Sequence, residues 1–503
     1  MGDTPPAANV LTDRLLRSWL RCRRKAWLDR HGDATKRRWT AHRNLMLDDQ
    51  QRCFVALMPQ KPAHGQAGCE AGAAGVVGLR LKGRGPGGVL LEAHPPLLRR
   101  VSGRSRWGDF AYQPVLARQG RRMTREHQLP LALMALLLEQ EQQAPVRDAL
   151  VVGGGGMGRR PARDRVGMSA GLRKQLGDAL RKLRLDLDRD DPPPLAADRR
   201  KCTLCSWRGL CNAEAAAEGH LSEVSGIGAK RREMLKELGI HGLQDLAAAD
   251  PDRLAEQMQR FGEQHGDVAR TLVAQARCQR DGQPERLQDS PALPELTGAP
   301  GVLVYDIESD PDARHDFLHG FWRLPLRSDG CWDVNAARYQ PLLVLAEHGE
   351  QRCWKRLDRY LRVHDGWPVL HYGETESLAL RRMAERQGVP ERELTLLRGR
   401  LVDVHARVRS HWRLPLNSYG LKAVAAWQGF RWSQEGVDGA HALLWWRQWQ
   451  GDGQNRRGNT NALGWIFTYN QDDCRATWAV ADWLLRQSPS TSPSQRQSGD
   501  GGS

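Results

Sequence analysis

The 503-residue sequence contains no run of about 18 apolar residues, the length that a helix needs to cross a bilayer. The first 14 residues also lack the apolar core and the small-residue cleavage site of a secretory signal. We therefore expect no membrane partner and a cytoplasmic location.

Two further features are missing. The glycine run 153–156 is not followed by Gly-Lys-Ser/Thr, which argues against a phosphate-binding P-loop. A disulfide framework is not expected either, because cysteines stay reduced in the cytoplasm. The ten cysteines are instead candidates for metal ligands or for small buried hydrophobic residues.

Acidic residues are outnumbered by basic ones. The chain has 75 Lys and Arg against 59 Asp and Glu, a formal net charge of +16. Such a surplus favours polyanionic partners, nucleic acid before membrane. Arginine and lysine cluster at 21–25, 36–38 and 99–106. Any one cluster is explained by a solvated face, so the summed charge is the stronger indication.

Two pairs of polar residues stand out near the C-terminus. The apolar run 302–308 predicts a strand, in which Asp306 and Glu308 lie on the same face because they are two residues apart. Tyr469 and Asp473 are four apart on a predicted helix and also share a face. Carboxylates gathered in this way repel one another unless a divalent cation neutralises them, which is the chemistry of a two-metal phosphoryl-transfer site.

This pattern resembles the DEDD superfamily of 3′–5′ exonucleases. The first motif of that family, Asp-x-Glu on a strand, is matched by Asp306 and Glu308, and its third motif, Tyr-x-x-x-Asp, by Tyr469 and Asp473. The resemblance implies a ribonuclease H-like domain over 301–487.

The second motif of the family supplies one more acid. Glu376 is the best match, because it begins a predicted helix, and Glu374 is the alternative. Asp403, after another apolar start, is a candidate for a supporting acid or a further ligand. The resemblance implies that Tyr469 orients the attacking water and that Mg²⁺ or Mn²⁺ is held by Asp306, Glu308, Glu376 and Asp473.

Three cysteines follow a proline break at 192–194 in the spacing Cys202-x2-Cys205-x5-Cys211. A fourth ligand is needed, and Cys22, on a predicted basic helix over 11–31, is the candidate. Four thiolates suit either Zn²⁺ or an iron–sulfur cluster.

One upstream cysteine with a downstream C-x2-C-x5-C resembles the iron–sulfur nucleases of the RecB and Cas4 type. The resemblance covers 1–212 and implies a [4Fe–4S] cluster, with Zn²⁺ as the alternative. It makes Asp109 the first nuclease acid and aligns the family's acid-x-Lys with Leu116-Ala117-Arg118, where the acid is absent. We therefore expect this domain to be catalytically impaired, unless Glu92 or Glu126 substitutes.

The segment 213–289 reads as helical. Gly226 and Gly228 form a tight turn before a helix that begins with Lys230 and Arg231, which resembles a helix-hairpin-helix motif. Such a turn lets backbone N–H groups approach a DNA phosphate. The alternative is a helical hairpin that only packs domains.

The predicted fold class is therefore multidomain α/β: a RecB/PD-(D/E)XK-like domain, a helix-hairpin-helix connector and a ribonuclease H-like exonuclease domain. This order resembles the TM0106-type RecB-like nucleases. We expect a metal-dependent nuclease, a DNA 3′–5′ exonuclease of repair or recombination that cuts in its C-terminal domain. The alternative is a non-catalytic iron–sulfur scaffold that binds nucleic acid. The Ser- and Gly-rich tail 488–503 is expected to be disordered.

Overall fold

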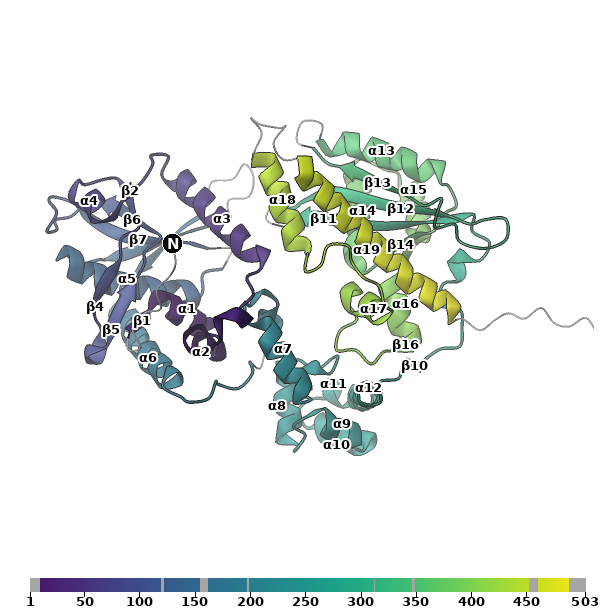
Figure 1. The fold of residues 1–503 in the computed structure, drawn as a ribbon, viewed down its shortest axis with the longest axis horizontal. Helices are drawn as coiled ribbons and strands as arrows, with labels where there is room; N and C mark the ends of the chain where they lie inside the picture. The colour runs from purple at the N-terminus through teal and green to yellow at the C-terminus, as the bar shows by residue number, and fades with distance from the viewer. Residues whose placement is uncertain are drawn as a thin grey trace, which may run out of the picture. The chain divides into compact units, whose positions relative to one another are not determined.

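The computed structural model shows a mixed α/β protein of more than one domain (Figure 1). It describes residues 10–118, 122–153, 162–196, 199–311, 313–345, 349–451 and 460–487. The predicted disordered tail and all of the glycine run except Gly153 lie outside these ranges. The chain forms two compact units: Met1–Glu218 with Pro311–Arg314, and Gly219–Asp310 with His315–Ser503. No helix in the described ranges is long and apolar enough to cross a membrane.

The first unit contains a six-stranded sheet in the order β2-β3-β6-β7-β8-β9 and a three-stranded sheet in the order β1-β5-β4. The six strands are β2 (Ala63–His64), β3 (Gly75–Val77), β6 (Leu97–Val101), β7 (Ala111–Arg118), β8 (Asp148–Gly153) and β9 (Ala162–Gly167). The three are β1 (Val10–Thr12), β4 (Leu81–Arg84) and β5 (Leu90–Ala93).

The core of this unit is built around the helix α5 (Arg125–Gln142). Its residues 129–135 are apolar on every side and all buried, as expected for a helix enclosed by other elements. α5 contacts β7 and the helices α1 (Asp13–Arg21) and α6 (Ala170–Leu187). The remaining helices of this unit are α2 (Arg23–His31), α3 (Ala41–Leu57), α4 (Gly65–Glu70) and α7 (Arg208–Ala217).

The single helix predicted over 11–31 is wrong, because the chain breaks at Cys22. This residue has an extended backbone (φ −161°, ψ 122°) between α1 and α2. The break lets α2 turn so that the buried Arg24 donates to the carbonyl of Pro193 over 2.9 Å and pairs with Glu214. Long-range contacts of α2 thus override the continuous helical pattern.

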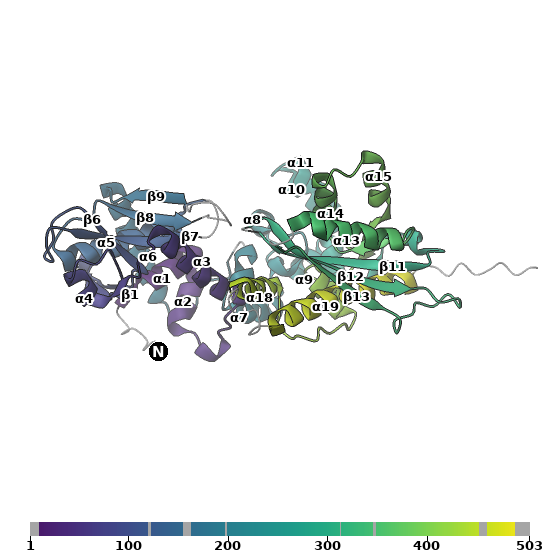
Figure 2. The ribbon, with the colours of Figure 1, turned by 90° about the horizontal axis from the view of Figure 1, so that it is seen from above.

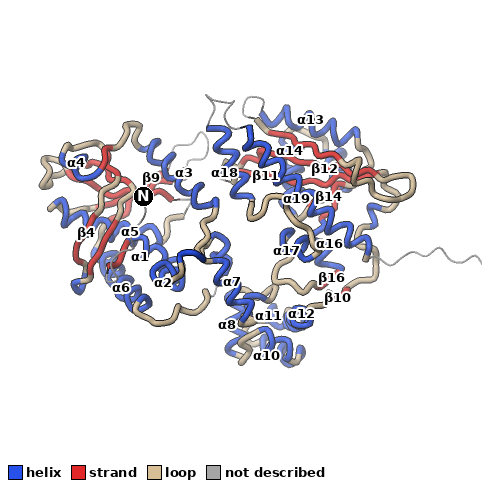
Figure 3. The backbone as a smooth tube through the Cα atoms, in the orientation of Figure 1, coloured by secondary structure: helices blue, strands red, loops and turns tan. Residues whose placement is uncertain are grey.

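The second unit begins with a helical segment, coloured entirely as helix and loop in Figure 3. Its helices are α8 (Ala229–Glu237), α9 (Leu243–Ala248), α10 (Pro251–Gln259), α11 (Glu263–Gly266) and α12 (Ala269–Asp281). The expected helix immediately before the glycine turn is only a 3₁₀ turn, Leu221–Glu223. The segment is followed by a short strand, β10 (Glu285–Arg286), which pairs with β16 (Trp412–Arg413).

The C-terminal domain is a five-stranded sheet in the order β13-β12-β11-β14-β15. β11 is antiparallel to β12 and parallel to β14. The strands are β11 (Gly301–Asp310), β12 (His315–Pro325), β13 (Arg338–Leu343), β14 (Val369–His371) and β15 (Leu401–Asp403).

Helices cover both faces of this sheet (Figure 2). One face carries α13 (Gly349–Val363), α14 (Glu374–Arg386) and α15 (Glu391–Arg400). The other carries α16 (Val404–His411), α17 (Leu421–Trp427) and α19 (Thr460–Arg486), with α18 (Gly439–Gly451) beside α19. The alternation of β11 follows from this sandwich: Leu303 packs against the first group and Val302 and Val304 against the second.

Candidate active site

Three carboxylates converge in the C-terminal domain. Asp306 and Glu308 stand at the end of β11, and Asp473 comes from α19, which lies across that strand (Figure 1). One oxygen from each side chain lies within 4.8 Å of the other two, a spacing at which they could hold a metal ion. Among the described residues, no other three His, Cys, Asp or Glu side chains come this close.

The alternation of side chains along β11 explains why both acids lie on the face of the sheet that α19 covers. Val302 and Val304 point toward α19, so the even-numbered Asp306 and Glu308 continue on that side. The β11–β12 register shifts directly after Glu308, so the regular pairing is interrupted beside the site and resumes at Ser309.

Keeping these carboxylates charged costs free energy, because they are buried and lie close to one another. Burial, followed by the charges of Asp473 and Glu308, raises the pKa of Asp306 well above its ordinary value. The pKa of Glu308 is raised well above its ordinary value by burial and by Asp473. A divalent cation would remove this repulsion, so the donor set fits Mg²⁺ or Mn²⁺.

Neighbouring donors orient the acids, and Asn470 hydrogen-bonds to Glu308 as well as to Asp306. The amide Nδ2 of Asn470 donates to Asp306 Oδ2 over 2.6 Å, and its Oδ1 accepts from the Tyr339 hydroxyl over 2.7 Å. Trp432 Nε1 donates to Asp473 Oδ1 over 2.6 Å. Sequence patterns did not single out these donors. Only Asn470 could have been suspected from the sequence, because it directly follows Tyr469 of the third motif.

Glu376 approaches the same centre from the first turn of α14. Burial, followed by the charges of Asp403 and Asp473, raises its pKa to about 7, and its own charge raises the pKa of Asp306. Its Oε2 is buried without a hydrogen-bond partner among the described residues. A buried oxygen of this kind is suited to bind a metal ion. Glu374, by contrast, is exposed.

Asp403 supports the site from β15. Its Oδ1 accepts from the backbone N–H of Gly373 over 3.0 Å and from that of Ala406 over 3.2 Å. It therefore caps α16 and fixes the turn from which α14 begins, which places Glu376.

Tyr469 is buried and hydrogen-bonded to Asp473. Burial and the charge of Asp473 raise its pKa, so its hydroxyl keeps its proton. The Lys422 ammonium lies 5.1 Å from the centre of the Tyr469 ring, and its charge works to lower the pKa values of Glu308 and Asp473. No sequence pattern singles out Lys422.

The four predicted cysteine ligands line one cavity of about 30 Å³ in the first unit. Cys22 reaches it from the α1–α2 break, Cys202 and Cys205 from the segment before α7, and Cys211 from α7 itself. Burial, and then the neighbouring Cys205, raise the pKa of Cys202. Burial is also the main reason that the pKa of Cys211 is raised, to about 11.

The nuclease acids expected in the first unit do not assemble. Asp109 is almost fully exposed, Leu116 is buried at the expected acid position, and the buried Arg118 is paired with Asp164 over 2.8 Å. Glu92 pairs with Arg80 over 2.8 Å.

The glycine turn of the helical segment has a defined conformation. Gly226 has a positive φ of 90° and is exposed, and Gly228 caps α8. Lys230 is exposed, whereas the Arg231 guanidinium donates to the Gly226 carbonyl over 2.8 Å. Arg231 therefore braces the turn.

Comparisons with known proteins bear on the C-terminal domain. Residues 303–485 match the RNase_H superfamily, and this range includes every acid of the centre. No curated protein matches the chain. A solved structure described as the crystal structure of SSO0001 aligns at 11% identity and a TM-score of 0.24, over 41% of this chain and 88% of that one, too weak a likeness to support an argument. The chain is therefore a multidomain α/β protein with an RNase H-like domain at residues 303–485, a fold that fits a nuclease.

Proposed function

We propose that the protein is a metal-dependent 3′–5′ exonuclease acting on DNA, with catalysis in the C-terminal domain. The observation that carries the proposal is the meeting of Asp306, Glu308 and Asp473 within 4.8 Å in an RNase H-like domain. The unpartnered Oε2 of Glu376 supports it as the fourth acid.

The roles follow from the contacts. Asp306, Glu308, Glu376 and Asp473 would hold Mg²⁺ or Mn²⁺, which activates water and stabilises the leaving oxygen in phosphodiester hydrolysis. Asn470 keeps the Asp306 carboxylate in one orientation. Tyr469, protonated and hydrogen-bonded to Asp473, is placed to orient a water beside the acids.

The test is cleavage of end-labelled single- and double-stranded DNA and RNA with Mn²⁺ or EDTA, comparing wild type with Asp306→Ala. Metal-dependent shortening from the 3′ end of DNA, lost in the variant, is the expected result. Shortening from the 5′ end, or of RNA alone, would contradict the polarity or the polymer. Binding without any shortening would favour the alternative, a non-catalytic scaffold.

For the first unit, we propose a DNA-binding domain that carries a [4Fe–4S] cluster on Cys22, Cys202, Cys205 and Cys211. The four cysteines line one cavity, and their number and spacing resemble those of the iron–sulfur nucleases, which supports the cluster; Zn²⁺ is the alternative.

We further propose that the turn at Gly226 and Gly228 binds a DNA phosphate, with Lys230 adding charge. The exposure of Lys230 and the open α8 N-terminus support this role. Lys230→Glu should weaken DNA binding and flatten its salt dependence, as measured by fluorescence anisotropy. Lys236→Glu, at the far end of α8, is the matched control, and an equal effect of both changes would contradict the assignment.

A further inference from the structure

A basic loop with an exposed tryptophan joins α2 to α3 in the first unit. Trp39 is 54% exposed, although indole is one of the largest apolar side chains. Lys36, Arg38 and Arg43 around it are also exposed. A single exposed tryptophan is not remarkable by itself, so its surroundings decide its meaning.

Two guanidinium groups lie over the Trp39 ring. Arg43 is 3.6 Å and Arg37 is 4.1 Å from the ring centre. Both distances are well inside the roughly 6 Å range of a cation–π contact. A guanidinium held flat on a ring keeps its N–H groups directed outward in the plane, where they match the geometry of phosphate oxygens.

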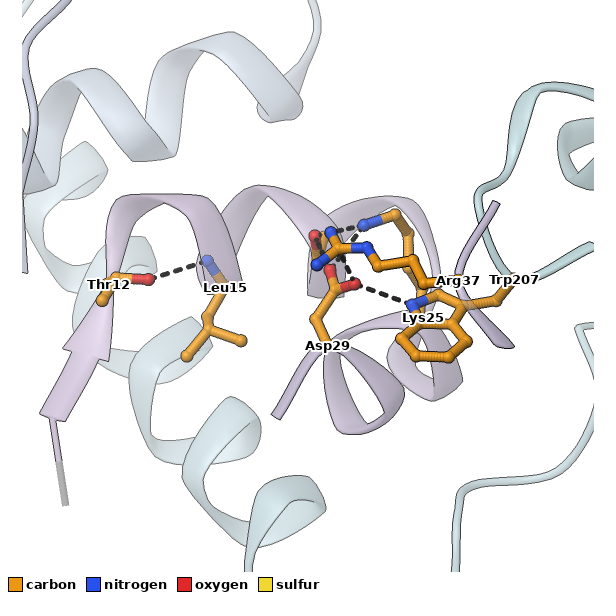
Figure 4. Close-up of polar contacts among 7 residues, drawn as sticks. Thr12, Leu15, Lys25, Asp29, Arg37 and Trp207 are labelled. Atoms are coloured by element: carbon orange, nitrogen blue, oxygen red, sulfur yellow. Dashed lines mark hydrogen bonds and ion pairs between the residues drawn. The ribbon is translucent and has the colours of Figure 1, made fainter. Parts of the chain in front are cut away.

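The loop is held in place at its base. Arg37 pairs with Asp29 over 3.1 Å, and Asp29 also accepts from Trp207 Nε1 over 2.8 Å and from Lys25 Nζ over 2.5 Å, as Figure 4 shows. Burial works to raise the pKa of Asp29, but the charge and hydrogen bond of Lys25 outweigh it, so the carboxylate stays charged. The Arg38 backbone N–H donates to the Ser206 carbonyl over 2.8 Å.

We propose that Trp39, with Arg37, Arg38 and Arg43, forms a binding surface for single-stranded nucleic acid. Because guanidinium groups already lie over the Trp39 ring, an unpaired base stacks on the outer plane of a guanidinium, and the neighbouring basic groups contact the flanking phosphates. A duplex keeps its bases stacked internally and cannot use this platform. The surface takes its ligand class from the proposed nuclease function, but it lies outside the RNase H-like domain.

The anchoring also distinguishes this surface from an incidental charge cluster. Asp29 neutralises Arg37 at one side, whereas Lys36 and Arg38 outnumber the only acid of the loop, Asp33, which accepts from Thr35. A pre-set loop loses less conformational entropy on binding than a mobile one.

The experiment is fluorescence anisotropy of the full chain with short labelled single strands of DNA and of RNA and with a blunt DNA duplex. EDTA is present throughout, so the result does not depend on cleavage. Trp39→Ala should raise the Kd for single strands by roughly 5- to 150-fold, the range for loss of one stacked base. Arg38→Gln and Arg43→Gln should each lower the salt slope by about 1.

Matched controls come from α6 of the same unit. Leu185→Ala removes another exposed apolar side chain and Arg181→Gln another exposed arginine, and neither should change binding. A bromouracil-substituted strand should photocrosslink within the loop that carries Trp39. Unchanged single-strand binding by Trp39→Ala, or equal weakening for the duplex, would overturn the proposal even if the enzyme cleaves. Selective weakening would support it even if no cleavage occurs, and the DNA and RNA series show which polymer is bound.

Discussion

Asn470 on α19 and Asp306 on β11 are joined by a hydrogen bond of 2.6 Å, although 164 positions separate them in the chain. Asn470 is completely buried and sits directly over Gly320, which pairs with Asp306 in the β11–β12 register. A Cβ added at Gly320 would lie 1.7 Å from Asn470 Oδ1. The missing side chain of this glycine is therefore what lets Asn470 reach the acid.

Gly320→Ala should displace Asn470 and loosen Asp306. We expect Mn²⁺ affinity, measured by isothermal titration calorimetry, to fall by about 10- to 100-fold, the usual cost of losing a group that orients a metal ligand. Gly330→Ala is not a suitable control because Gly330 has a positive φ of 81°. Gly167→Ala is suitable, since nothing lies within 4 Å of the added Cβ. Unchanged Mn²⁺ affinity in Gly320→Ala would contradict the positioning role of Asn470.

Glu376→Gln and Glu374→Gln should differ sharply. Glu376 is electrostatically coupled to Asp306 and Asp473, whereas Glu374 is exposed on the same turn of α14. We expect Glu376→Gln to lower kcat/KM at least about 100-fold, a loss of about 2.7 kcal/mol of transition-state stabilisation, and Glu374→Gln to leave it unchanged. A larger loss of kcat/KM in Glu374→Gln than in Glu376→Gln would show that Glu374 is the second-motif acid.

Asp306→Asn should stabilise the metal-free protein while abolishing its response to metal. The substitution removes a buried charge that repels Glu308 and Asp473 but keeps an oxygen to accept from Asn470. We expect a gain of about 1–2 kcal/mol in the free energy of unfolding in EDTA. Mn²⁺ should raise the Tm of wild type and not of the variant. Destabilisation in EDTA would show that the acids do not repel one another as inferred.

Cys205→Ala should lose the broad visible absorbance and the iron of an iron–sulfur cluster. Anaerobically purified wild type should contain about four iron atoms per chain. Cys331→Ala is the matched control, because Cys331 is an exposed free cysteine in the other unit. Finding one zinc and no iron per wild-type chain would contradict the iron–sulfur assignment and support Zn²⁺ as the bound metal.

The RNase H-like domain could be predicted from the sequence because its motifs depend on local periodicity. Asp306 and Glu308 share a strand face, and Tyr469 and Asp473 share a helix face, whatever the rest of the chain does. The common approach of Asp306, Glu308 and Asp473 then required only that β11 and α19 pack together. The spacing of Cys202, Cys205 and Cys211 predicted that they lie together, and the structure brings Cys22, the candidate fourth ligand, to the same cavity.

The tertiary structure decided what periodicity could not. Cys22 lies in a break rather than within a helix because Arg24 contacts Pro193 and Glu214, which are 169 and 190 positions away. Between Glu374 and Glu376, the choice depends on which one faces the other acids. Lys422 reaches Tyr469 from a different helix. These relationships arise from packing between distant segments, and the local spacing of residues contains no information about that packing.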